Sequence, residues 1–357
     1  MSAITQSATS KKLAPATWLV LLSLGVVIIG LADIALGSVS IPFGEVAQVL
    51  SGGETSSKVW NNILVNIRIP KTLTAMLAGM ALSVGGLQLQ TLFRNPLAGP
   101  SVLGISAGAS LGVATVILAS GQSVAVSTLW SSGVGQGWLL VIASSAGAAT
   151  VLLLILAISL RVNDNIVLLI IGIMIGNVTL AVVSIWQYFS QPEQIRDYLL
   201  WTLGSVGNVT IEQLRIFSVL TLLSIFITFL FSKNLNGLLL GERYARSMGI
   251  PLLPTRIGII ITTSVLVGLV TGFCGPIGFI GIAVPHLVRS LLSTSDHRWL
   301  IPACALAGAL ILIGCDLISQ WPGRAWVLPI NAITALIGSP VVIWVILHRR
   351  NLSTHFR

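Results

Sequence analysis

The chain has 357 residues, of which 55% are hydrophobic and only 8% are charged. Soluble globular domains carry roughly 25% charged residues, so this composition excludes a soluble domain and indicates a polytopic membrane protein. The formal net charge is +9, but the basic residues are scattered among the loops and form no dense cluster, which argues against nucleic-acid binding.

Ten apolar segments approach the length that crosses a bilayer, which is about twenty helical residues. The predicted spans are 17–37, 70–92, 101–120, 138–160, 166–189, 211–231, 257–273, 276–292, 300–319 and 328–347. The first segment follows two lysines, but it is longer than the apolar core of a cleaved signal peptide, so we interpret it as a retained span. The expected fold class is therefore an all-α integral membrane protein with about ten transmembrane helices.

An even number of spans places both termini on the same side of the membrane. With the termini in the cytoplasm, most of the 19 Lys and Arg residues also lie there, as the positive-inside rule requires. We therefore expect one transmembrane domain over residues 1–357. Its cytoplasmic parts would be an N-terminal tail at 1–16, the largest loop at 232–256 and a C-terminal tail at 348–357.

The outer side is expected to carry two long connections, at residues 38–67 and 190–210. A short amphipathic helix is predicted in the second, from Arg196 to Leu203. The motif RIPK, Arg68 to Lys71, lies at the predicted outer mouth of the second span. Two cations there suit lipid headgroups, or they could accept acidic groups of an external protein.

The segment LFRNPLAGPSVLGISAGASLG, residues 92–112, interrupts the apolar pattern. Asn95-Pro96 is expected to end one helix, because proline disfavours a helical residue before it. A new helix is expected to start near Pro100 and Ser101, which would put Gly104, Gly108 and Gly112 on one face. Such a face allows close helix packing, and it could equally line the inner end of a central path.

The cytoplasmic loop contains LGERYARSMGIP, residues 240–251. We expect a short basic amphipathic helix from Glu242 to Met248, with Gly249 as its C-cap and Pro251 after it. This helix could be a solvated connection or a docking element for a cytoplasmic partner.

The segment GFCGPIGFIGIAVPHLVR, residues 272–289, is too rich in glycine and proline for a regular span. It predicts a kinked packing helix or a broken segment beside the path. His286 could be a ligand, a proton relay or a structural hydrogen-bonding group. Asp316 is the acidic residue within a span that we single out as a functional candidate.

Several nucleotide-binding and catalytic motifs are absent from the sequence. There is no phosphate-binding G-x-x-x-x-G-K-[ST] loop, no HExxH and no GxSxG. The three cysteines, Cys274, Cys304 and Cys315, form no C-x-x-C pair, which indicates packing residues. We therefore expect no catalytic residue, metal site or cofactor in this chain itself.

Six segments together resemble the FecCD-like permease family of bacterial importers for iron–siderophores, haem and cobalamin, which are type II ABC importers. In chain order they are RIPK, LFRNPLAGPSVLGISAGASLG, LGERYARSMG, GPIGFIGIAVPHLVR, DHRWLIPACALAGA and LPINAITALIGSP. The match extends over about residues 60–350, nearly the whole chain.

The resemblance implies a multi-pass permease with the type II ABC importer fold in the bacterial inner membrane. It implies a second permease subunit, favouring a homodimer, two cytoplasmic ATPase subunits and one periplasmic substrate-binding protein. ATP and magnesium would be bound by the ATPase partner. The transport cycle would be alternating access.

The resemblance also assigns roles to residues of this sequence. The cytoplasmic gate matches Asn95, Pro96 and Leu97. Contact with the ATPase matches a set in the largest loop: Gly241, Glu242, Ala245, Arg246 and Gly249. Docking of the binding protein matches Arg68 and Lys71, although the family usually has arginine at the latter position. Gln320 stands where the family has a further docking arginine, so we assign that role to Arg324.

The cargo is the least determined feature. Ferric siderophore is the first expectation on family breadth, followed by haem and cobalamin. A different class, an ion-coupled secondary transporter, would need intramembrane charges along the path, and Asp316 is essentially the one found. An integral membrane enzyme would need a catalytic cluster near one interface, and no such cluster is visible.

Overall fold

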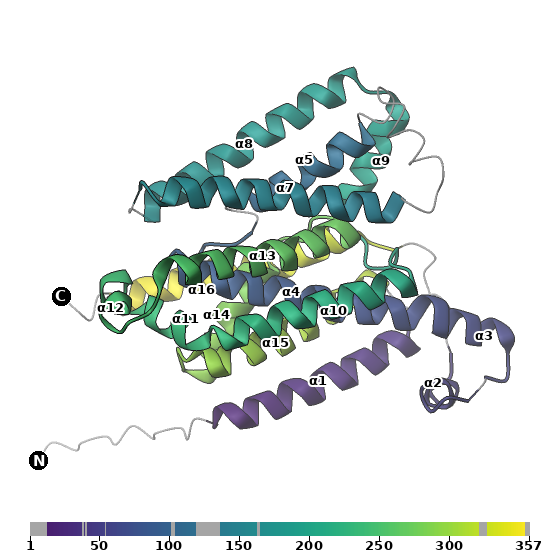
Figure 1. Cartoon of the computed structure of the whole chain (residues 1–357). Coiled ribbons are helices and arrows are strands. Elements are labelled where there is room, and N and C mark those ends of the chain that lie inside the picture. The colour runs from purple at the N-terminus through teal and green to yellow at the C-terminus, as the bar shows by residue number, and fades with distance from the viewer. Residues whose placement is uncertain are drawn as a thin grey trace, which may run out of the picture.

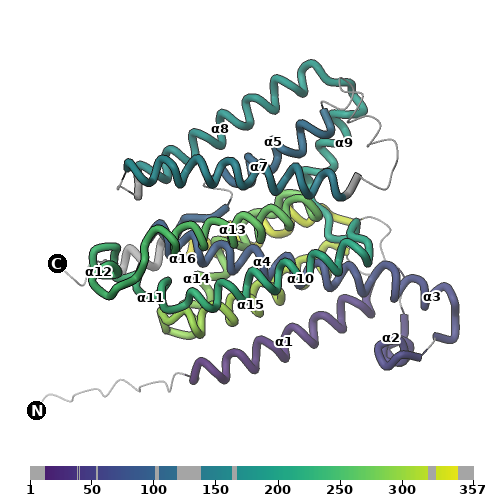
Figure 2. The backbone as a smooth tube through the Cα atoms, viewed as in Figure 1, coloured from purple at the N-terminus to yellow at the C-terminus, as the bar shows by residue number. Residues whose placement is uncertain are grey.

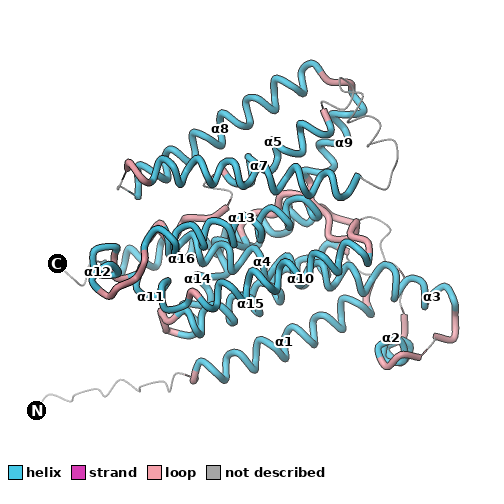
Figure 3. Tube along the Cα trace, in the orientation of Figure 1, coloured by secondary structure: helices cyan, strands magenta, loops and turns pink. Residues whose placement is uncertain are grey.

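The computed structural model describes residues 13–37, 39, 41–53, 55–100, 104–118, 136–162, 165–320 and 327–353. All regular structure in these residues is helical, as Figure 3 shows. The elements in chain order are α1 (Pro15–Ala35), α2 (Phe43–Leu50), α3 (Lys58–Ile63), the π-helical η1 (Leu64–Arg68), α4 (Ile69–Leu92), α5 (Ile105–Ile117), α7 (Gln136–Ser159), α8 (Asn165–Phe189), α9 (Pro192–Thr202), α10 (Ile211–Leu230), α11 (Ser232–Leu239), α12 (Glu242–Ser247), α13 (Leu252–Cys274), α14 (Ile280–Leu292), α15 (His297–Ser319) and α16 (Ile330–Ser353).

Ten apolar helices correspond one to one with the ten predicted spans. Seven of the described helices are long and apolar enough to cross a membrane, and three shorter apolar helices lie at Ile105–Ile117, Ile280–Leu292 and Ile330–Trp344. This confirms the all-α membrane fold class. Several helix starts differ from the prediction: α5 starts at Ile105 rather than 101, α13 at Leu252 rather than 257, and α14 at Ile280 rather than 276.

The helices form two groups, and the larger group is built around one central helix (Figures 1 and 2). One group holds α5, α7, α8 and α9, and the other holds α1, α10 and α13 to α16 around α4. The helix α4 packs against α15, α13, α14 and α10, while α13 joins the groups by packing on α7. Since α4 touches so many helices, a shift of α4 changes contacts in most of the second group.

The two ends of the helical bundle carry different elements. In Figure 1, α1 begins and α16 ends at the end of the molecule where α12 lies, whereas α2 and α3 lie at the opposite end. This arrangement agrees with the predicted placement of both termini and the largest loop on one side. That this side faces the cytoplasm remains a prediction.

The second span starts earlier than predicted, because one continuous helix runs from Lys58 to Leu92. The predicted outer connection 38–67 therefore contains α2 and the first part of this helix. Its π-helical stretch ends with Ile69 N–H donating to the Leu64 carbonyl. A π turn of this kind accommodates Pro70, which has no N–H to donate. The RIPK motif consequently lies within a helix and not at its start.

A buried glutamine links three helices in the middle of the bundle. Gln88 of α4 donates to the hydroxyls of Thr228 (2.8 Å) and Thr262 (2.9 Å), and its Oε1 accepts from the Thr263 hydroxyl at 2.7 Å. A polar side chain inside a membrane protein needs such partners, because lipid offers none. The contact fixes the register of α4 against α10 and α13.

Candidate gate and coupling site

The turn after α4 is built as the Asn-Pro break predicts. Arg94 has a positive φ of 47°, and the Asn95 N–H donates to the Gln90 carbonyl at 3.1 Å. The Asn95 Oδ1 accepts from the backbone N–H of Leu97 at 2.9 Å. An asparagine side chain that caps its own turn in this way stabilises a sharp change of direction. Asn95, Pro96 and Leu97 are half-buried.

Helix α14 braces this turn from the side. The Nε2 of His286 lies 2.9 Å from the Pro96 carbonyl oxygen, and since a carbonyl only accepts, this nitrogen carries a proton. Arg289, one turn further along, donates to Gln90 Oε1 at 2.6 Å. His286 is therefore a hydrogen-bonding residue of the gate turn, which is the structural option left open by the sequence.

The glycine-rich segment before α14 is broken and not merely kinked. Helix α13 ends at Cys274, Gly275 follows with a φ of 77°, and α14 begins only at Ile280 after Phe279 at a φ of 66°. Gly275 and Ile277 of this irregular stretch are buried and the other three residues are half-buried, so the protein covers a backbone whose polar groups need partners other than lipid.

The coupling helix α12 has a C-terminus of the Schellman type. Gly249, with a φ of 76°, donates its N–H to the Arg246 carbonyl, and Ile250 donates to the Ala245 carbonyl, both at 3.0 Å. These bonds satisfy the last carbonyls of the helix. Gly241 precedes the helix with a φ of 104°. Both glycines therefore hold backbone conformations that other residues adopt only with strain.

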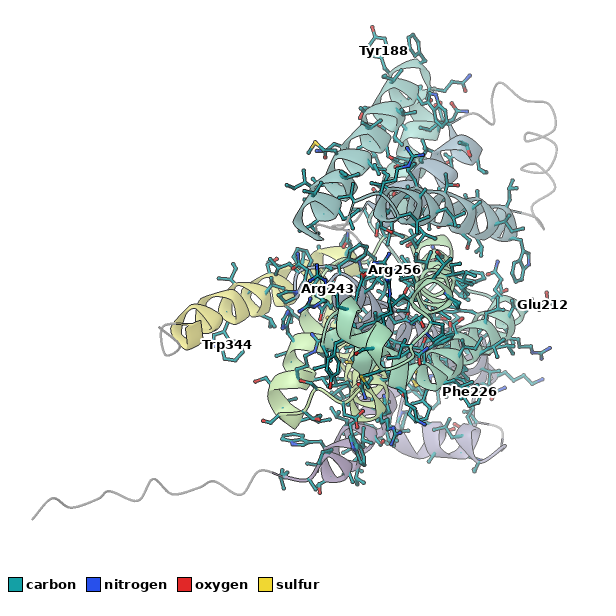
Figure 4. The ribbon with its side chains drawn as sticks, turned by 60° about the vertical axis from the view of Figure 1, so that its left-hand side comes forward. Tyr188, Glu212, Phe226, Arg243, Arg256 and Trp344 are labelled. Carbon is teal, nitrogen blue, oxygen red and sulfur yellow. The ribbon has the colours of Figure 1, made fainter. Side chains whose placement is uncertain are left out.

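The two faces of α12 differ in exposure. Ala245 is fully buried, while Arg243, Tyr244, Arg246 and Ser247 are exposed. Glu242 forms an ion pair with Arg256 of α13. Figure 4 labels Arg243 and Arg256 and shows them in the same region of the molecule. The exposed residues thus form a basic outer face, and the buried alanine anchors the helix.

The structure brings the coupling helix and the gate turn together, which the sequence alone does not. A hollow of about 1020 Å³ is lined by Arg94 of the gate turn and by a set from the loop: Leu240, Gly241, Glu242, Arg243, Tyr244, Arg246 and Ser247. A partner that fills this hollow would touch the coupling helix and the turn at once.

The glycines after the gate turn serve close packing. A Cβ on Gly112 would lie 1.9 Å from the Ala143 carbonyl oxygen, and one on Gly108 would lie 2.6 Å from that of Gly147. These contacts place α5 directly against α7. The expectation that Gly104 shares this helix face is wrong, because Gly104 precedes α5 with a φ of 72° and packs on α8.

At the opposite end, Arg68 does not offer a free charge. Its side chain is only 6% exposed, and its guanidinium donates to the carbonyls of Ile34 (2.9 Å), Ala35 (2.8 Å) and Val39. The last carbonyls of a helix lack intrahelical partners, so Arg68 completes the C-terminus of α1. The guanidinium is thus engaged within the protein, and the predicted role of Arg68 in docking a binding protein stays a prediction.

Lys71 is also engaged, in a cluster between three helices. Its Nζ lies 3.1 Å from Oδ1 of Asp316, whose Oδ2 accepts from Gln320 at 2.8 Å. Asp33 of α1 accepts from the Thr72 hydroxyl at 2.5 Å. The sequence analysis missed Asp33, although an acid inside the first span is itself a signal.

Comparison with known proteins identifies the chain. The model of the FecCD transport family matches residues 24–348. The chain belongs to the FecCD transport family. It is 34% identical to the hemin transport system permease protein HmuU of Yersinia pestis over 325 residues, covering 91% of this chain and 93% of that protein. It is 36% identical to the vitamin B12 import system permease protein BtuC of Klebsiella pneumoniae subsp. pneumoniae over 312 residues, covering 87% and 90%.

A solved structure extends the likeness to three dimensions. A metal-chelate type ABC transporter in an inward-facing conformation superposes with a TM-score of 0.79 at 28% identity, covering 93% of this chain and 99% of that one. The chain is accordingly a multi-pass membrane permease of an ABC importer of the FecCD family.

Within this FecCD permease, two of the assigned docking residues lie at one hollow. Arg68 and Lys71 both line a hollow of about 460 Å³ at the end opposite α12, together with Gly204, Gly207 and Gln320. Gln320 donates to Asp316 and, at 3.4 Å, to Asp33. Arg324 lies outside the residues that the structure describes. Among the described residues, no group of three or more His, Cys, Asp or Glu could hold a metal ion.

Proposed function

We propose that this chain carries a metal chelate across the inner membrane by alternating access, as the permease of an assembly driven by a separate ATPase. The assembly would contain a second permease, favouring a homodimer, two ATPase subunits that bind ATP and magnesium, and a periplasmic binding protein. The observation that carries the mechanism is the shared hollow between α12 and Arg94.

In this mechanism the ATPase binds the exposed face of α12. Closure of the ATPase pair displaces α12, which is a rigid element because both its ends are capped by glycine turns. The displacement would reach the gate turn at Asn95 to Leu97 through Arg94, which precedes these residues and lines the same hollow as α12. Opening of that turn would let cargo pass to the cytoplasm.

The class of cargo follows from the relatives. Hemin and vitamin B12, which appear in the names of two relatives, are metal complexes of macrocycles, and the structural neighbour is named for metal chelates. Ferric siderophore, the first expectation from the sequence, belongs to the same class. We propose import of one of these three, and the names of the relatives support haem and cobalamin as candidates equal to the siderophore.

The alternative of an ion-coupled secondary transporter gains one observation from the structure. Asp33, Lys71 and Asp316 are charged groups within or beside the spans. They lie at one end of the bundle, and each has a hydrogen-bonding or ionic partner. Such a cluster is better suited to hold α1, α4 and α15 together than to form a relay across the membrane.

The deciding experiment is uptake into proteoliposomes that contain the permease, its ATPase and its binding protein. Labelled ferric siderophore, haem and cobalamin would be supplied in parallel, with and without ATP and with each partner omitted in turn. We expect uptake of one cargo that requires ATP and both partners. Uptake driven by an ion gradient without the ATPase would refute the proposal.

A further inference from the structure

A chain of polar side chains, half-buried at Asn236 and Asp296 and buried at His297 and Thr91, connects the loop 232–256 to α4, which precedes the proposed gate turn. Asn236 of α11 donates through Nδ2 to Asp296 Oδ1 at 2.7 Å, and its Oδ1 lies 2.7 Å from Nδ1 of His297. On the other side of the ring, Nε2 of His297 lies 2.8 Å from the hydroxyl of Thr91 in α4. His297 and Thr91 are both fully buried, so solvent does not replace the contact between these two side chains.

The partners of Asn236 fix the proton on the ring. Only the amide nitrogen can donate to the Asp296 carboxylate, and only the amide oxygen can accept from the backbone N–H of His297, at 2.9 Å. The amide orientation is therefore determined. Since Oδ1 can only accept, Nδ1 of His297 carries a proton, and Nε2 is then free to accept one from Thr91.

The Thr91 hydroxyl has a choice between two acceptors. It lies 2.8 Å from Nε2 of His297 and 2.9 Å from the Leu87 carbonyl oxygen of its own helix. A hydroxyl has one proton, so with the ring proton on Nδ1 it donates to one acceptor at a time. If His297 moves away, the hydroxyl keeps the Leu87 carbonyl as an acceptor, so this contact offers two alternative arrangements.

This series of hydrogen-bonded side chains ends close to the gate turn on one side and close to α12 on the other. The carbonyls of Gln90 and Thr91 accept from the N–H groups of Asn95 (3.1 Å) and Arg94 (3.3 Å), so the gate turn begins at Thr91. At the other end, a Cβ on Gly237 would lie 2.1 Å from Cδ1 of Ile250, the residue after the α12 turn. Helix α11 therefore packs closely against the residue that follows α12.

We infer that Asn236, His297 and Thr91 are positioning residues that transmit a movement of α11 and α12 to the gate turn. This route acts beside the direct contact at Arg94, and it rests on the proposed function as an ATP-driven importer. Its two-state element is the Thr91 hydroxyl, whose acceptor changes when His297 moves with Asn236. Two arrangements that both sites favour differently distinguish a coupling route from residues that merely lie between two sites, and the experiment below tests for them.

The test replaces the Thr91 hydroxyl and keeps the shape of the side chain. Thr91→Val removes both bonds, and Thr91→Ser keeps the hydroxyl. Thr74→Val is a matched control, because Thr74 is a fully buried threonine of the same helix whose hydroxyl bonds only to the Pro70 carbonyl, at 2.7 Å. The measurement is the number of cargo molecules imported per ATP hydrolysed in proteoliposomes, together with the amount of assembled complex.

We expect Thr91→Val to lower the ratio of transport to hydrolysis roughly 2- to 30-fold, the range seen for residues of coupling networks. Thr74→Val should leave the ratio unchanged, and Thr91→Ser should restore it. Thr91→Val and His297→Gln act on one route, so the double variant should be no worse than the worse single variant.

Two results would overturn the inference and leave the importer intact. One is a Thr91→Val complex whose ratio equals that of Thr74→Val, and the other is a double variant whose losses multiply. If His297→Gln does not assemble, the three threonine variants decide alone. A wild-type complex that hydrolyses ATP without any uptake would refute the proposed function and this inference together.

Discussion

Individual glycines set how closely the helices of this permease approach one another. At Gly112 the backbone of α7 lies so near that no side chain fits, whereas a Cβ at Gly314 of α15 would meet no atom within 4 Å. Both glycines lie within helices, so they differ in environment and not in secondary structure. Substitutions at Gly112 and Gly314 therefore distinguish the effect of helix packing on stability from the effect of helix propensity.

Gly112→Ala is expected to destabilise the protein by about 1–3 kcal/mol, because its Cβ forces α5 and α7 apart and overpacking costs this much. Gly314→Ala should be neutral or stabilise by about 1 kcal/mol, since alanine is the better helix former. Thermal unfolding of the detergent-solubilised protein measures both. Equal behaviour of the two variants would contradict the close contact between α5 and α7.

At the scale of elements, the N-terminus of α15 depends on Asp296. Its carboxylate accepts from the backbone N–H of Arg298 at 3.0 Å and from the Asn236 amide at 2.7 Å. Two hydrogen bonds hold the pKa of this carboxyl below its ordinary value of 3.8. The bond from the backbone N–H of Arg298 has the larger effect, and the bond from Asn236 has the smaller one. A lowered pKa in the folded state means that the charged form stabilises the fold.

Asp296→Ala should cost about 1 kcal/mol at pH 7, the usual loss when a helix loses its N-cap. The contribution of the carboxylate is complete above its unfolded pKa, near 3.8, and disappears as the pH falls through the lower folded pKa. Wild type and variant should therefore differ at pH 7 and converge at strongly acidic pH. Unfolding midpoints across this range test the claim, and Glu212→Ala, an exposed acid in the first turn of α10, is the control.

At the scale of the whole molecule, the basic face of α12 and the hollow lined by Lys71 lie at opposite ends of the bundle. Arg246 is exposed on α12, while Arg215 is exposed near the start of α10, toward the end that carries α2 and α3 (Figure 1). A partner that binds one end has no contact with the other. Charge reversal at the two arginines therefore separates binding of a cytoplasmic ATPase from a general effect of charge.

Arg246→Glu is expected to weaken co-purification of the ATPase subunit roughly 10-fold, since like charges placed at an interface oppose association. Arg215→Glu should leave co-purification unchanged. Both side chains are exposed, so neither substitution should alter the unfolding midpoint by much. Loss of ATPase binding in Arg215→Glu, with Arg246→Glu unaffected, would reverse the proposed orientation of the permease.

Much of the fold and part of the site could be predicted from local sequence. Span lengths follow from apolar runs, the Asn95-Pro96 break from proline, and the end of α12 from Gly249, because each depends on neighbouring residues in the chain. The roles of Arg68 and of the glycine face could not be predicted, because they depend on which distant helix lies opposite. The early start of the second span was missed because Lys58 to Arg68 is polar enough to resemble a loop.

The sequence by itself thus determined an all-α membrane fold of about ten spans, the turn at Asn95-Pro96 and the short loop helix, for which we propose gate and coupling roles. Apolar length and backbone-restricting residues act locally, so no partner is needed to interpret them. The tertiary structure alone decided that Arg94 and α12 share a hollow, and that Thr91 meets His297, which lies 206 residues further along the chain. Such pairs are selected by how α4, α11 and α15 pack, and that packing is a property of the folded bundle.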